Sequence, residues 1–155
     1  MELFILRHGS AHPDAVKDSE RALNATGREA VEQILRENAQ RLEGINHVLV
    51  SPYLRAQQTC EIALRFLPKI PAKNVHTVDC LVPTASPKSV IEHLSERGFS
   101  SVLCVSHQPL LGTLLDEICD FEPGQYRLAT GALAQIHFDD LVAKGLGKLR
   151  WLKQP

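Results

Sequence analysis

The chain has 155 residues and contains no apolar run that approaches the length of a membrane-spanning helix. Residues 1–6 have neither the basic region nor the long apolar segment of a secretion signal. We therefore expect a protein of the cytoplasm that has no membrane partner.

The chain also lacks a strong net charge and any closely spaced cysteines. Its formal net charge is -1, so no overall field attracts nucleic acid, and a bound anion would need a local cluster of cations. The four cysteines are widely spaced without a C-x-x-C pair, which suggests neither a zinc site nor a redox motif.

No internal repeat, low-complexity stretch or linker divides the sequence. Its length suits one domain, and a content of 44% hydrophobic and 23% charged residues is ordinary for a soluble globular protein. We therefore predict a single domain over residues 1–155.

Three short apolar runs are typical of strands buried on both faces. They cover residues 2–6, 47–51 and 101–106. Weaker strands are predicted over 75–80, over 132–138, where apolar residues alternate, and over 148–152 as the neighbour of 132–138 at the sheet edge.

Helical patterns separate these strands. One helix begins after an Asn24 N-cap and ends at Gly44, and another follows Ser51 as N-cap with Pro52 in its first position, running to residue 66 before Pro68. Further helices are predicted over 88–96, closed by Gly98, and from Pro109 onward. The alternation indicates an α/β fold of three layers, α/β/α, with a mostly parallel central sheet.

The three strongest strands all end in similar chemistry, namely Arg7-His8, Ser51 to Arg55, and Ser106-His107. The carboxyl ends of parallel strands lie at one edge of a sheet, so two arginines and two histidines can converge there. Arginine forks match phosphate oxygens, and the helix N-termini predicted at Pro52 and Pro109 favour anions. The pattern indicates phosphoryl transfer.

These residues resemble the motifs of the histidine phosphatase superfamily, which has the phosphoglycerate mutase-like fold. Arg7-His8-Gly9 is similar to its first motif, residues 51–59 to its S-x-x-x-R-A-x-x-T motif, and Ser106-His107 to its third. Arg21-Ala22-Leu23 with Gly27 is similar to a further stretch, although Asn24 replaces its usual threonine. In its short length and in the residues of these motifs, the chain most resembles the bacterial phosphohistidine phosphatases of this superfamily.

The resemblance implies a role for each matching residue. His8 would be the nucleophile, Arg7 and Arg55 would clamp the phosphoryl oxygens, and His107 would donate a hydrogen bond to them, with its protonation state left open. Arg21 at the mouth of the pocket and Gly9 would bind substrate.

No metal or other cofactor is expected. His12 lies four residues after His8, but this stretch offers no carboxylate or cysteine at a matching spacing, so His12 is interpreted as a surface imidazole.

The chain departs from the superfamily in one respect. Members that hydrolyse phosphate esters usually carry a carboxylic acid after the third strand, where this chain has residues 81–86 with Pro83 and no acid. An alkoxide leaves poorly without a proton, whereas an imidazole, with a pKa of about 6.5, can leave unaided. The sequence therefore favours a phosphorus–nitrogen bond, as in a phosphohistidine-bearing protein such as a histidine phosphotransfer domain.

Two alternatives remain open at this point. A small-molecule phosphomonoesterase of the same superfamily could take its acid from Asp14, Asp18 or Glu20 on the first loop. A module that only binds phosphorylated partners is the other, although the presence of both arginines and both histidines gives no sign of inactivation.

Overall fold

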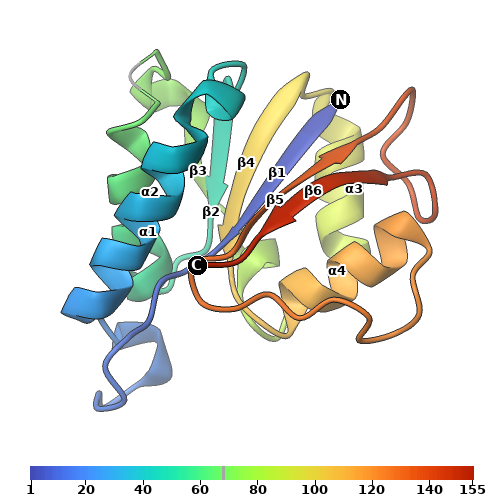
Figure 1. The fold of residues 1–155 in the computed structure, drawn as a ribbon. Coiled ribbons are helices and arrows are strands. Elements are labelled where there is room, and N and C mark those ends of the chain that lie inside the picture. Colours follow the sequence, from blue (N-terminus) through green and yellow to red (C-terminus); the bar gives the residue numbers. More distant parts are fainter. Residues whose placement is uncertain (68) are drawn as a thin grey trace.

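The computed structural model describes residues 1–67 and 69–155, and within them a six-stranded sheet lies between two layers of helices (Figure 1). The strands are β1 (Glu2–Arg7), β2 (His47–Val50), β3 (Val75–Thr77), β4 (Ser101–Ser106), β5 (Leu133–His137) and β6 (Lys148–Lys153). The α-helices are α1 (Ala25–Asn38), α2 (Leu54–Leu64), α3 (Pro87–Arg97) and α4 (Leu110–Cys119). Short 3₁₀ turns cover Asp18–Glu20, Ala39–Leu42, Ala72–Asn74 and Asp79–Leu81.

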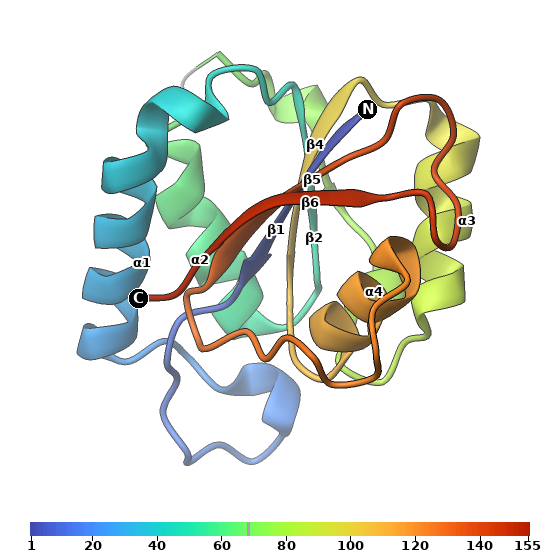
Figure 2. The same ribbon diagram turned by 45° about the vertical axis from the view of Figure 1, so that its right-hand side comes forward.

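The strand order is β3-β2-β4-β1-β5-β6. The first four of these strands are mutually parallel, and β5 and β6 extend the sheet in antiparallel pairing. Helices α1 and α2 cover one face, and α3 and α4 cover the other, as the two ribbon views show (Figures 1 and 2). The predicted three-layer α/β/α fold with a mostly parallel sheet is confirmed.

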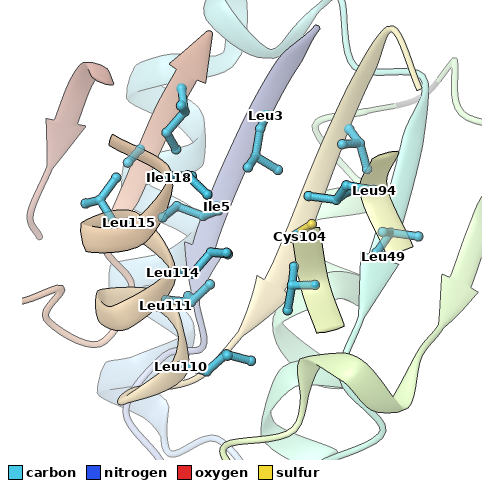
Figure 3. Packing of buried hydrophobic residues seen from close by; sticks show 14 of the residues in the cluster. Leu3, Ile5, Leu49, Leu94, Cys104, Leu110, Leu111, Leu114, Leu115 and Ile118 are labelled. Carbon is cyan, nitrogen blue, oxygen red and sulfur yellow. The ribbon is translucent and has the colours of Figure 1, made fainter. Parts of the chain in front are cut away.

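The apolar runs are continuous because both faces of the sheet are covered. In β1, Leu3 and Ile5 pack with the residues of α3 and α4, including the leucines of α4 (Figure 3). Phe4 and Leu6 point the other way, into the cluster formed with α1 and α2. Every second side chain therefore belongs to the opposite half of the core.

The predicted start of α1 and both predicted ends of α3 are confirmed, but the predicted end of the first helix at Gly44 was wrong, because α1 ends at Asn38 and a 3₁₀ turn follows it. Asn24 caps α1 by accepting a hydrogen bond from the Gly27 N–H at 2.7 Å, and Gly98 ends α3 at a φ of 61°. The strand predicted over 75–80 is shorter, because a 3₁₀ turn begins at Asp79. Within the described residues, no helix is long and apolar enough to cross a membrane.

The predicted start of the second helix was wrong. Helix α2 begins at Leu54 rather than Pro52, and Tyr53 is its N-cap residue. Ser51 does not cap it, because its hydroxyl lies 2.7 Å from a ring nitrogen of His107. The predicted end of this helix at residue 66 was also wrong, because α2 ends at Leu64. Pro68 itself lies outside the residues that the structure describes.

The strand order and the placement of the helices indicate where a ligand-binding crevice lies. Strands β1 and β4 are neighbours with Arg7 paired to Ser106, but the helices that follow them, α1 and α4, lie on opposite faces. Open α/β sheets bind ligands at such a switch point, outside the carboxyl ends of the strands. The loop that follows β1 hangs below these ends in Figure 1.

Candidate active site

Two histidines lie side by side where β1 and β4 end. The His8 N–H donates to the Ser106 carbonyl oxygen at 3.0 Å, which continues the pairing of the two strands by one residue. The ring centroids of His8 and His107 are 4.9 Å apart. The exposed fraction is 7% for His8 and 0% for His107, so both imidazoles are held in the interior beneath the crevice.

The hydrogen bonds of His8 define which ring nitrogen is free to react. Its Nδ1 lies 2.7 Å from the carbonyl oxygen of Gly9, which can only accept, so Nδ1 carries the proton. The Nε–H of Arg55 donates to Nε2 at 3.1 Å, so Nε2 carries a lone pair. Burial, reinforced by the positive charges of Arg55, Arg7 and Arg21, lowers the pKa of His8 to about 4. His8 is therefore neutral at pH 7.

His107 is also neutral. Burial, followed by the nearby His8 and Arg55, lowers its pKa to about 3. Its Nε2 lies 2.7 Å from the hydroxyl oxygen of Ser51, while its Nδ1 is buried without a hydrogen-bond partner. Because the Ser51 hydroxyl oxygen already accepts from the Tyr53 N–H at 3.4 Å, we assign the hydroxyl as the donor to Nε2. The proton of the neutral ring then resides on Nδ1, which has no acceptor among the residues described.

Arg55, in the first turn of α2, is held on several sides and has an exposed fraction of only 4%. Its Nη1 donates to the backbone oxygen of Asp18 at 2.6 Å, and its Nη2 donates to Oδ2 of the same residue at 2.9 Å. Its guanidinium carbon lies 5.0 Å from the ring centroid of Tyr53. The arginine thus reaches His8 from a fixed direction.

Arg21 joins the same cluster through Asp18. Its Nη1 lies 3.1 Å from Oδ1 of Asp18, and its Nε donates to the His12 backbone oxygen at 2.7 Å. Sequence reasoning considered Asp18 only as an acid and missed its contacts with both arginines. Its position three residues before Arg21, in the short loop after Arg7-His8-Gly9, was the available signal.

Arg7 lies at the end of β1 and donates from Nη1 to the backbone oxygen of Leu128 at 2.7 Å. Its Nε is buried without a hydrogen-bond partner in the part of the chain that the structure describes, and burial followed by the charge of Arg55 lowers the pKa of Arg7. Beside it is a hollow of about 530 Å³ that is also lined by Pro109, Thr113 and Tyr126. Like His107, Arg7 thus has a buried N–H with no acceptor.

Gly9 packs against the start of α1. A β-carbon on Gly9 would lie 2.5 Å from the Gly27 oxygen, and one on Gly27 would lie 2.1 Å from the Ser10 oxygen. The Gly9 N–H donates to the Thr59 hydroxyl at 3.2 Å, and its carbonyl accepts from His8. These backbone contacts fix the turn on which His8 sits.

The structure therefore brings the residues singled out in the sequence to one edge of the sheet. They are Arg7, His8, Gly9, Arg21, Arg55 and His107. Residues 81–86, which include Pro83 and no acidic residue, pass the same end of β4. The Ser106 hydroxyl there donates to the Leu81 backbone oxygen at 2.7 Å. Among the residues described, no group of three or more histidine, cysteine or acidic side chains could hold a metal ion.

The chain is similar to known proteins over its whole length. The family model of the histidine phosphatase superfamily (branch 1) matches residues 3–80. The chain is 35% identical to the phosphohistidine phosphatase SixA of Escherichia coli K12, over 100% of this chain and 94% of that protein. It is 32% identical to a SixA homolog of Haemophilus influenzae, over 76% of this chain and 77% of that protein.

A solved structure of the protein histidine phosphatase SixA in complex with tungstate superimposes with a TM-score of 0.86 at 34% identity. The match covers 100% of this chain and 97% of the other. The similarity thus extends over the whole length of the chain.

Proposed function

Since the chain belongs to branch 1 of the histidine phosphatase superfamily, we propose that it is a phosphohistidine phosphatase acting on a phosphorylated protein. The proposal covers residues 1–155 as one catalytic domain. Its central observation is the neutral imidazole of His8, whose Nε2 lone pair faces Arg55 in a site that also contains His107.

The reaction has two steps. In the first, Nε2 of His8 attacks the phosphorus and the bond from phosphorus to the substrate imidazole breaks, with its electron pair staying on the leaving nitrogen. The other nitrogen of the substrate ring carries a proton, so the ring departs as neutral imidazole. The Nδ1–H of His8 remains bonded to the Gly9 oxygen and shares the positive charge that the ring gains. In the second step water attacks the phosphorus, the bond from phosphorus to Nε2 of His8 breaks with its electron pair staying on Nε2, and a proton of the attacking water passes to solvent.

The surrounding groups bind the charge on the phosphoryl oxygens. Arg55 turns its Nε–H from the His8 lone pair to an oxygen, and the buried N–H groups of Arg7 and His107 that lack protein acceptors donate to others. Arg21 supplies positive charge at the mouth. Gly9 serves the substrate through His8, since its own N–H is bonded to Thr59.

Asp18 is poorly suited to the role of acid that an ester would require. Its slight burial would raise its pKa, but the hydrogen bonds and charges of Arg55 and Arg21 together lower the pKa below its usual value. The carboxylate is thus ionised at neutral pH and has no proton to give. The absence of a proton on Asp18 favours a substrate whose leaving group needs no proton, such as an imidazole.

The partner we propose is a protein that displays its phosphohistidine on the surface, such as a histidine phosphotransfer domain in a signalling pathway. The hollow beside Arg7 gives room for the residues that flank the phosphohistidine. We also propose a cytoplasmic location, where the four cysteines would persist as the thiols seen in the structure.

The test compares a phosphohistidine protein with sugar phosphates as substrates of the purified enzyme. General acid catalysis is worth roughly 10²–10⁴-fold, so the sugar phosphates should be slower by about that factor. Equal rates, together with an Asp14→Asn or Glu20→Gln variant that loses only the ester activity, would establish the phosphomonoesterase instead. No turnover of any substrate would leave a binding module.

A further inference from the structure

Asp18 contacts Arg55 and Arg21 at once, although it belongs to none of the three strand-end motifs. We propose that Asp18 is a positioning residue, which holds the guanidinium of Arg55 so that its Nε edge faces the phosphoryl group on His8. The inference rests on the proposed function, because it concerns the same phosphoryl site.

The geometry of the guanidinium supports this role. A guanidinium can bind through its end, with Nη1 and Nη2, or through its side, with Nε and the adjacent hydrogen of Nη2. Asp18 occupies the end, since its backbone oxygen and Oδ2 accept from Nη1 and Nη2. The Nε–H on the side points at Nε2 of His8 at 3.1 Å, where the phosphorus must bind.

The remaining contacts limit the rotation of the group. The ring of Tyr53 lies 5.0 Å from the guanidinium carbon and fixes the plane from one face. With its end bound by Asp18, the side edge is the part of Arg55 left for the phosphoryl oxygens. Asp18 can keep its bonds while Arg55 exchanges His8 for substrate.

The exposure of Asp18 argues against a role in folding alone. The Arg55 side chain is 5% exposed, but that of Asp18 is 55% exposed, and ion pairs with so exposed a partner contribute little to stability. Oδ1 of Asp18 also holds Arg21 at 3.1 Å. One carboxylate thereby sets the spacing of two cations that face the same substrate.

The experiment is a double-mutant cycle of Asp18→Asn with Arg55→Lys, measured as kcat and KM on a phosphohistidine protein. In the native background, Asp18→Asn should lower kcat roughly 10-fold, because a small misplacement of a clamping group is costly. In the Arg55→Lys background, the same change should have an effect of less than about 2-fold, since lysine has no fork to orient. Asp14→Asn, on the same loop, is the matched control and should leave kcat unchanged.

Two further measurements make the result decisive. Unfolding in urea should show that Asp18→Asn is as stable as the native protein, and its affinity for tungstate should fall together with kcat. Full activity of Asp18→Asn, or an equal loss in both backgrounds, would overturn the inference. A loss confined to ester substrates would instead identify Asp18 as an acid.

The inference and the proposed function fail in different ways. If the native enzyme hydrolyses an aryl phosphate but no phosphohistidine protein, the proposed function is wrong. The cycle can then still be measured on the aryl phosphate, where coupling between Asp18 and Arg55 would support the positioning role and its absence would refute it.

Discussion

Lowering the pH from 7 to 5 should destabilise the fold through the two buried histidines of the site. Burial, aided by neighbouring positive charges, lowers the pKa of His8 to about 4 and that of His107 to about 3. In the unfolded chain each has a pKa of about 6.5. Between pH 6.5 and the folded values, mainly the unfolded state takes up the proton. The free energy of unfolding therefore falls as the pH falls through this window.

The size of the effect follows from the same values. Each pH unit inside the window costs about 1.4 kcal/mol per histidine, so the change from pH 7 to pH 5 amounts to about 2 kcal/mol for each ring. That is a substantial fraction of the 5–15 kcal/mol by which domains are typically stable. In a His107→Gln variant the contribution of one ring is absent at every pH.

The assay is urea unfolding at pH 7, 6 and 5, followed by the fluorescence of Trp151, the one tryptophan in the sequence. Between pH 7 and pH 5 the native protein should lose about 2 kcal/mol more than His107→Gln does. The reasoning is refuted if His107→Gln and the native protein lose the same free energy.

Four further predictions concern the reaction. His8→Ala should fold but lose turnover, and the acid-labile, alkali-stable phosphate trapped on the native enzyme should be missing from it; a near-native rate would exclude His8 as nucleophile. Arg55→Lys keeps the charge but not the fork, so the rate should fall by about 10-fold or more, whereas equal rates would contradict two-point binding. A chelator should leave the native rate unchanged, and inhibition that added metal reverses would reveal a metal site. Across a series of phosphate esters, the rate should rise steeply as the leaving-group pKa falls, and a flat series would indicate a hidden acid.

The strand ends were predictable because their signal is local. Each run, such as residues 2–6, is apolar throughout and then changes abruptly to charged or imidazole side chains. A strand buried on both faces ends close to the point where such residues begin, as β1 ends at Arg7, and parallel strands bring these ends together. The positions of His8 and His107 follow from that rule, and the 4.9 Å between their rings agrees with it.

What could not be predicted depends on contacts between distant segments. Serine is a residue type that often caps helices, but the tertiary structure places the Ser51 hydroxyl against His107, 56 residues away in the sequence. Asp18 looks like any loop carboxylate until the fold places Arg55 beside it. Local preferences for capping and exposure are weak, amounting to about 1 kcal/mol, and one buried hydrogen bond can override them.

The close approach of Gly9 and Gly27 has a consequence for recognising active relatives. The nearest atoms that exclude a side chain at these two positions are main-chain oxygens, which every residue possesses, so a second substitution could not remove them. Selection for a folded chain alone would therefore preserve both glycines, even in a descendant that had lost the His8 imidazole. A sequence search weighted toward these glycines would collect proteins that share the fold, whereas His8 and Arg55 distinguish active enzymes from inactive relatives.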